Sequence, residues 1–199
     1  MSTKLKIAAA VAAAVLLSAC SSPKHEPMPL VSFTPSLEVT EVWSKGLSSA
    51  EGFLVPAVYD DMVFAAGGKT LTRLNARTGE TEWSVSFNSP ITGGVGSDGY
   101  VTAVGLWDGN LEVVDAGGKV SWEKKLTTEL ASPPVVSHGL VIARTMDTRV
   151  SAFEASSGEL QWTYQKSQPA LTVRLPTRML AHDNFLLVGQ PNGHIVILD

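Results

Sequence analysis

Short apolar stretches separated by tight polar turns run through most of the chain from about residue 55 onward. Turns recur every 8–12 residues, and no helical spacing of apolar positions interrupts the pattern. Asp108-Gly109 and Asn192-Gly193 are dipeptides that favour hairpin turns, because Gly adopts positive φ at low cost. The pattern therefore predicts short antiparallel strands joined by hairpins.

The expected strands follow the same order in successive units. First strands are expected near Val55 to Val58 and Pro134 to Val136. Second strands are expected at Met62 to Ala66, Val101 to Gly105, Leu140 to Arg144 and Phe185 to Gly189. Third strands are expected at Leu71 to Leu74, Leu111 to Val114, Val150 to Phe153 and Ile195 to Leu198. A polar turn with Ala and Gly follows the third strands of the first three of these units, and a fourth β-prone stretch comes after it.

Tryptophan marks the repeat. Trp43, Trp83, Trp122 and Trp162 are spaced by 40, 39 and 40 residues. Repeats of this length with four strands are typical of a β-propeller, in which an ordered Trp packs where one blade meets the next. We therefore predict an all-β propeller of four-stranded antiparallel blades, built of PQQ-like or WD40-like repeats. Trp107 falls outside the spacing and in a turn, so it is the one Trp expected to make surface contacts.

The position of Asp199 within its repeat bears on the size of the propeller. The matching residue in an earlier repeat, Asn75, lies 8 positions before Trp83. The fourth repeat is therefore expected to lack its last strand, and an open stack would expose unpaired strand edges. We expect the chain to be the N-terminal part of a longer propeller; the alternative is a closed four-bladed wheel.

The N-terminus has the features of a bacterial lipoprotein signal. Lys4 and Lys6 precede an apolar run of 11 residues, 7–17, and Leu17-Ser18-Ala19-Cys20 ends it at the only Cys of the chain. This run is too short to span a bilayer, which needs roughly 20 apolar residues, but it suits a cleaved signal. We expect a signal peptide over 1–19 and a lipid on Cys20; the alternative is an ordinary secretory signal with an incidental Cys. Ser21 after the cysteine favours the outer membrane of a Gram-negative cell.

Residues 20–36 are expected to form a tether, because four prolines fall within 21–36 and such a segment stays extended. The propeller is then expected over 37–199. With 44% hydrophobic and 17% charged residues, the composition is that of a globular protein. A net charge of -4 without a basic cluster gives no indication of a nucleic-acid partner.

The repeats carry a family resemblance. Leu71 to Trp83 and Gly109 to Trp122 resemble the signature of PQQ-like propeller repeats, Gly-x-Leu-x-x-Leu-Asp-Ala-x-Thr-Gly-x-x-x-Trp. Together with the lipoprotein signal and the tether, they resemble the BamB family of outer-membrane lipoproteins. The resemblance implies an eight-bladed propeller, of which about four blades are present, closed by pairing of the Trp43 segment with the last blade.

The same resemblance implies function. It implies a non-enzymatic scaffold on the periplasmic face of the outer membrane, within the β-barrel assembly machinery. The implied partners are a POTRA domain of the barrel-inserting protein BamA and unfolded outer-membrane proteins. The family's Leu-x-Leu-Arg-like contact loop matches Leu171, Val173 and Arg174, although the following residues 175–177 depart from the family. The alternative is that Leu171 and Val173 begin the next inner strand and that Arg174 is solvated.

Quinoprotein dehydrogenases share these repeats and provide the enzymatic alternative. Such an enzyme needs a carboxylate base and oxygen ligands for Ca²⁺ around its quinone. Asp60-Asp61 is the only adjacent carboxylate pair, and it falls in a turn between strands. His25, His138, His182 and His194 are scattered without metal-ligand spacing. We therefore predict no enzyme activity, no cofactor and no metal.

Overall fold

The computed structural model describes residues 28–49, 52–166 and 177–199. Its described regular structure consists of strands in four sheets, one sheet for each expected blade. Blade 1 comprises β2 (Ala57–Tyr59), β3 (Met62–Gly67), β4 (Thr70–Asn75) and β5 (Thr81–Ser86). Blade 2 comprises β6 (Ile91–Ser97), β7 (Val101–Leu106), β8 (Asn110–Asp115) and β9 (Val120–Lys125), and β1 (Phe53–Leu54) pairs with its first strand. Blade 3 comprises β10 (Val135–Ser137), β11 (Leu140–Arg144), β12 (Val150–Glu154) and β13 (Leu160–Tyr164), and blade 4 comprises β14 (Leu180–His182), β15 (Phe185–Gly189) and β16 (Ile195–Leu198).

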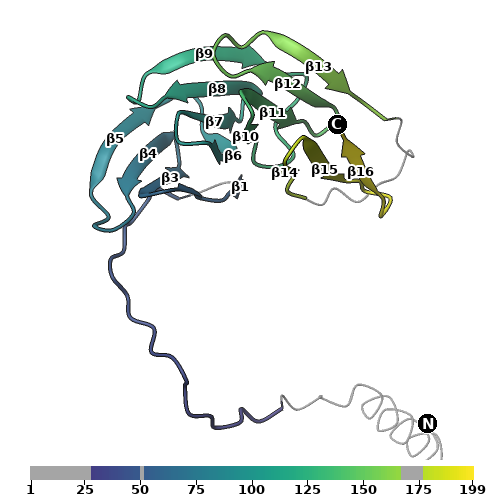
Figure 1. Ribbon diagram of the computed structural model, residues 1–199. Coiled ribbons are helices and arrows are strands. Elements are labelled where there is room, and N and C mark those ends of the chain that lie inside the picture. Colours follow the sequence, from purple (N-terminus) through teal and green to yellow (C-terminus); the bar gives the residue numbers. More distant parts are fainter. Residues whose placement is uncertain (1–27, 50–51, 167–176) are drawn as a thin grey trace, which may run out of the picture. The chain divides into compact units, whose positions relative to one another are not determined.

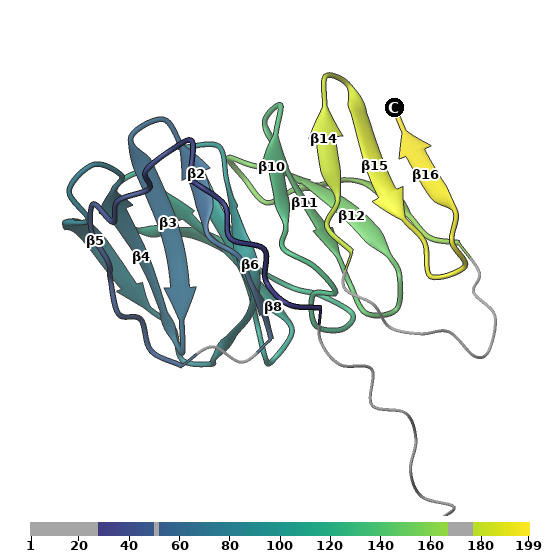
Figure 2. The same cartoon turned by 90° about the horizontal axis from the view of Figure 1, so that it is seen from below.

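The blades follow one another in an arc, with β5, β9 and β13 along its outside and the first strands of the blades on its inside (Figure 1). Apart from β1, neighbouring strands within each blade are antiparallel and consecutive in the chain. Figure 2 shows the sheets from a second direction, standing side by side. The predicted all-β propeller with four-stranded antiparallel blades is confirmed.

The described sheets pack through three apolar cores, each lying between two successive blades. Leu71 and Val104 meet between blades 1 and 2, and Leu111 and Val141 meet between blades 2 and 3. The third core, between blades 3 and 4, includes Val150 and Val188. In blades 2 and 3, apolar residues therefore point to both faces of the inner strands, because each of these two sheets lies between two of the cores.

The same junction, with a Trp at its centre, recurs from blade to blade. In each case the indole nitrogen donates a hydrogen bond to an Ala carbonyl in the turn of the next blade, and the ring covers a Gly of that turn. The junctions are Trp43 with Ala76 and Gly79 (2.8 Å), Trp83 with Ala116 and Gly118 (3.0 Å), and Trp122 with Ala155 and Gly158 (2.8 Å). The regularly spaced Trp residues in these junctions are packing residues, as predicted.

One strand pairing was not expected from the sequence. β1 runs parallel to β6, with Val55 N donating to Gly94 O at 2.7 Å and Val95 N donating to Val55 O at 2.8 Å. Added methyl groups at Gly93 and Gly96 would collide with Leu130 and Pro134, so blade 3 approaches the backbone of β6 closely. The glycines that allow this approach also lower the strand propensity of β6. For this reason the sequence pattern does not predict β6 as a strand.

Residues 1–40 form a unit separate from 41–199. Its described part, 28–40, is exposed throughout and contains no strand. In the described part of the chain, no helix has the length and apolar character needed to cross a membrane. The expected boundaries after residues 19 and 36 remain predictions.

Candidate functional site

The strand order gives the propeller two faces. We call one the connection face. It carries the turns 68–69, 107–109, 145–149 and 190–194, the links between blades at 87–90 and 126–134, and the described ends, 165–166 and 177–179, of the third link. The opposite face carries the remaining turns, such as those at Asp60 and Gly118. Because the strands within a blade alternate in direction, these assignments follow from the topology.

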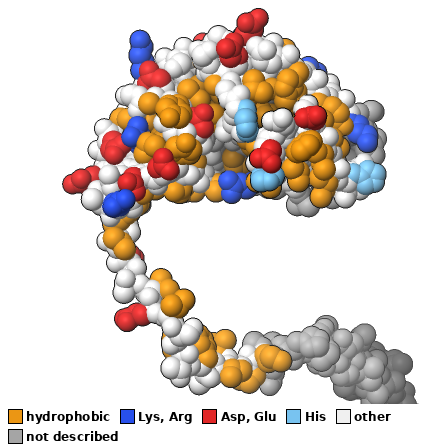
Figure 3. Space-filling model, in the orientation of Figure 1, with side chains coloured by type: hydrophobic (Ala, Val, Ile, Leu, Met, Phe, Trp, Pro, Cys, Tyr) orange, Lys and Arg blue, Asp and Glu red, His pale blue; other side chains and the backbone are white. Residues whose placement is uncertain are grey.

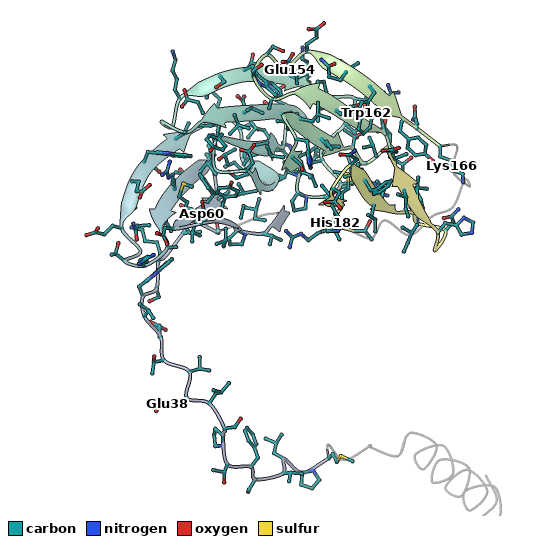
Figure 4. The ribbon with its side chains drawn as sticks, in the orientation of Figure 1. Glu38, Asp60, Glu154, Trp162, Lys166 and His182 are labelled. Carbon is teal, nitrogen blue, oxygen red and sulfur yellow. The ribbon has the colours of Figure 1, made fainter. Side chains whose placement is uncertain are left out.

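The predicted partner-contact residues Leu171, Val173 and Arg174 lie outside the described residues, as does Cys20. The two ends of the link that contains the contact residues are described. Lys166, labelled in Figure 4, is the last described residue before it, and Thr177 is the first after it. These two described ends, which follow β13 and precede β14, lie on the connection face.

A buried arginine holds the second end of this link. Arg144 on β11 is 4% exposed, and its Nη1 donates to Thr177 Oγ1 at 2.7 Å. Thr177 Oγ1 in turn donates to Gly189 O at 3.3 Å. Arg144 Nε has no hydrogen-bond partner in the described part of the chain, and burial lowers the pKa of the guanidinium. The arrangement fixes Thr177 between blades 3 and 4.

At the first end, Arg149 Nη2 donates to Gln165 Oε1 at 3.1 Å. Arg149 also lies 3.8 Å from Asp147 in an ion pair. Burial acts to raise the pKa of Asp147, but hydrogen bonds from Thr145, Thr127 and the Arg149 backbone outweigh it, and the pKa is lowered. Asp147 therefore stays ionised beside the link.

Blade 2 contains an acidic pair where its neighbours have hydroxyl groups. Thr72 with Ser84 and Ser151 with Thr163 form hydrogen bonds of 3.0 and 3.3 Å between the third and fourth strands of blades 1 and 3. The matching residues of β8 and β9 are Glu112 and Glu123, directly opposite each other.

Glu112 is 6% exposed and lines a crevice of about 260 Å³ between blades 1 and 2. Burial, then the negative charges of Glu123 and Asp108, then a hydrogen bond with Glu123 raise the pKa of Glu112 to about 7. No group of three metal-ligating side chains occurs among residues 28–49, 52–166 and 177–199. With a pKa of about 7, the carboxyl group of Glu112 holds a proton below neutral pH.

The residues considered for catalysis lie apart. Asp60 and Asp61 are exposed in the turn between β2 and β3, where Arg77 Nε and Nη2 donate to Asp61 at 3.0 and 3.1 Å. His138 lies in the turn between β10 and β11, His182 is the last residue of β14, and His25 is outside the described residues. Figure 3 shows acidic, basic and hydrophobic side chains interspersed over the visible surface.

The sequence reasoning missed Arg144 and the Glu112–Glu123 pair. Both stand out once the repeats are aligned by strand register. Arg144 occupies the position of Ala66 and Gly105, and Glu112 occupies that of Thr72. Departure from the repeat consensus at a buried position is the signal that identifies them.

Comparison with known proteins places these features in a family. The family model for outer membrane protein assembly factor BamB matches residues 68–199. BamB of Burkholderia pseudomallei is 38% identical over 197 residues, covering 96% of this chain and 52% of the relative. BamB of Bordetella pertussis is 30% identical over 190 residues, covering 92% and 49%. The crystal structure of BamB from Moraxella catarrhalis superposes with a TM-score of 0.63 at 27% identity, covering 73% of this chain and 44% of that one.

These repeats, junctions and sheets define a β-propeller of PQQ-like repeats. The chain belongs to the BamB family of outer membrane protein assembly factors. The family resemblance predicted from the sequence is thereby confirmed. The chain spans about half the length of the curated relatives it matches.

Proposed function

We propose that the chain is a non-enzymatic scaffold of the outer-membrane β-barrel assembly machinery, which assists the folding and insertion of outer-membrane proteins. The observation that carries this proposal is family membership. The curated relatives are named as assembly factors, not as enzymes, and their match extends over nearly the whole chain. Unfolded outer-membrane proteins are the proposed clients.

The proposed attachment is a lipid on Cys20, which holds the protein at the periplasmic face of the outer membrane. The tether then separates the lipid from the propeller. The extended and exposed form of residues 28–40 supports this role, because a Pro-rich segment spans about 3.1 Å per residue.

The proposed partner is a POTRA domain of a BamA-like protein, contacted by Leu171, Val173 and Arg174. Two observations support this location: the described ends of the link that contains them lie on the connection face, and Arg149 and Arg144 hold these ends. Two apolar side chains beside an Arg have the composition of a binding hot spot, because apolar anchors pair there with a forked hydrogen-bond donor.

Arg174→Glu tests the contact in a pull-down of the full chain with a purified POTRA region. We expect binding to weaken at least about tenfold, since loss of a desolvated Arg contact costs more than 1.4 kcal/mol. Lys119→Glu makes the same charge change on the opposite face and serves as the matched control. Equal binding by both variants and by the wild type would place the partner surface elsewhere.

A further inference from the structure

The turn between the second and third strands has the same construction in blades 2, 3 and 4. In each, a backbone nitrogen donates a hydrogen bond to the carbonyl three residues before it; the pairs are Gly109 to Leu106 (2.9 Å), Thr148 to Thr145 (2.9 Å) and Gly193 to Gln190 (3.0 Å). These donor residues have positive φ, of 83°, 67° and 81° respectively. An Asp or Asn directly precedes each donor, namely Asp108, Asp147 and Asn192. The three turns can therefore be compared residue by residue.

The blade 4 turn differs from the other two in the chemistry of this preceding residue. Asn192 carries a neutral amide, whereas Asp108 and Asp147 carry carboxyl groups. Despite burial, hydrogen bonds lower the pKa of Asp147, so its carboxyl group is ionised at neutral pH. A negatively charged carboxylate resists attack by a nucleophile, whereas the Cγ atom of a neutral amide accepts it. Among the three turns, the one in blade 4 therefore presents an electrophilic carbon.

The residue after Asn192 supplies a nucleophile. Attack by its backbone nitrogen on Asn192 Cγ closes a five-membered ring, which needs an unshielded nitrogen. Gly193 has no side chain to shield it, whereas Thr148 at the matching position of blade 3 is branched at Cβ. Of the five Asn residues in the chain, only Asn192 is followed by Gly; the residues after the others are Ala76, Ser89, Leu111 and Phe185. The sequence thus singles out this pair.

The structure leaves the Asn192–Gly193 pair accessible and polarised. Asn192, Gly193 and His194 are exposed, and a Cβ at Gly193 would meet nothing within 4 Å. His194 N donates to Asn192 Oδ1 at 3.2 Å. This hydrogen bond stabilises the negative charge that gathers on Oδ1 when a nucleophile adds to Cγ. The Gly193 nitrogen is released when its bond to Gln190 O opens, and an exposed turn opens more readily than a paired strand.

We propose that Asn192 is a self-modification site, at which the folded protein converts its own side-chain amide to a carboxyl group. The Gly193 nitrogen bonds to Asn192 Cγ, the Cγ–Nδ2 bond breaks, and the proton of the Gly193 nitrogen leaves with Nδ2 as ammonia. One water molecule then opens the cyclic imide. Opening at Cγ gives aspartate, and opening at the backbone carbonyl gives isoaspartate. The amide nitrogen is thereby exchanged for a water oxygen, without oxidation or reduction.

The modification would act on the hairpin of β15 and β16. Both products add a negative charge to the turn, and isoaspartate also routes the backbone through the side-chain methylene. The turn sets the register in which Gly189 pairs with Ile195 and Leu186 with Leu198. A longer turn therefore disturbs the pairing of blade 4, whereas aspartate changes its charge alone.

The test incubates the purified full chain at neutral pH in water enriched in heavy oxygen and follows every Asn by mass spectrometry of its peptides. We expect Asn192 to acquire one heavy oxygen, as a mixture of aspartate and isoaspartate, at least about tenfold faster than Asn184 reacts. Asn184 is the internal control, because it is also exposed in a turn of blade 4 but precedes Phe185.

Two variants of the pair complete the test. Gly193→Ala shields the nitrogen in a place where the new Cβ meets no other atom within 4 Å, and Asn192→Gln keeps the amide but requires a larger ring. Each is expected to remain folded and to slow the reaction at least about tenfold. Equal rates at Asn192 and Asn184, an unchanged rate in both variants, or aspartate without isoaspartate would overturn the inference. These measurements involve no partner, so their outcome is independent of the proposed function.

Discussion

At the scale of single residues, the Glu112–Glu123 pair gives blade 2 a pH-dependent stability. Glu112 has a pKa of about 7 in the folded protein against an ordinary value of 4.5. Between these values the folded protein holds a proton that the unfolded chain has released. The free energy of unfolding therefore falls as pH rises through this window and stays reduced above it.

Glu112→Gln removes the titrating group while keeping the shape and a hydrogen-bond donor. At pH 8 we expect the variant to be more stable than the wild type by roughly 2 kcal/mol, after allowing for water in the crevice. At pH 5 the gain should largely vanish, because Glu112 is then neutral in the folded protein. Denaturant unfolding at both pH values measures the difference.

Glu159→Gln is the control, because Glu159 is exposed in the turn between β12 and β13. It should change stability little at either pH. A Glu112→Gln effect of the same size at pH 5 and pH 8 would show that the carboxyl pair does not titrate in this range.

Single positions such as these could not be assigned from the sequence without the strand register. A Glu in a β-prone stretch is ordinarily solvated, and only the folded structure shows that Glu112 lies opposite Glu123 and is buried where it lines a crevice. The sequence pattern likewise predicts Arg144 only as the last residue of a strand and gives no sign of its burial. The proposed contacts at Leu171, Val173 and Arg174 lie outside the described residues and stay predictions.

At the scale of elements, the Trp–Gly junction can be tested with two glycines of similar conformation. Gly158 and Gly139 have φ of 71° and 73°. A Cβ at Gly158 would lie 2.7 Å from Trp122 Cδ2, whereas one at Gly139 would meet nothing within 4 Å. Comparing an Ala substitution at these two glycines therefore distinguishes the cost of backbone strain, which both share, from the cost of crowding against Trp122, which only Gly158 has.

Gly139→Ala is expected to cost about 1 kcal/mol of stability, the cost of a side chain at positive φ. Gly158→Ala should cost at least about 2 kcal/mol more, because the indole must move. Trp122→Ala should itself cost roughly 3–5 kcal/mol. Thermal or denaturant unfolding gives all three values.

The double variant supplies the internal check. In a Trp122→Ala background, Gly158→Ala should cost no more than Gly139→Ala, because the ring that it collides with is gone. A cost for Gly158→Ala that is the same with and without Trp122 would contradict the junction as described.

The observed second and third strands of the blades agree closely with the predicted ones. Short apolar stretches between turns that contain Gly are compatible with few structures other than strands in hairpins. β7, β8 and β12 match the predicted stretches to within a residue. β6 and β1 were not predicted, for opposite reasons. β6 is rich in glycine, and β1 is two residues long and held by a partner remote in sequence.

At the scale of the whole molecule, the N-terminal unit and the propeller have separate roles in our proposal. Cys20→Ser should leave unprocessed or soluble periplasmic protein, because the lipid contributes about 0.8 kcal/mol for each buried CH₂ and the variant lacks it. Fractionation of membranes after a high-salt wash, with intact mass of the extracted protein, measures this.

Ser21→Asp is the informative companion variant, since it keeps the lipidated cysteine. It should remain membrane-bound but shift toward the inner membrane. If Cys20→Ser still fractionates with the outer membrane after the salt wash, something other than a lipid on Cys20 holds the protein there.

The recurrence of one junction from blade to blade has an evolutionary consequence. Each Trp meets an Ala carbonyl and a Gly that lie about one repeat further along, so every junction accepts the same neighbour. Unequal recombination that adds or removes one unit of about 40 residues would create a new junction between blades. At that junction the indole nitrogen of a Trp would again meet an Ala carbonyl and a Gly of the next blade. Selection on such a gene can therefore change the number of blades before it changes any contact between them.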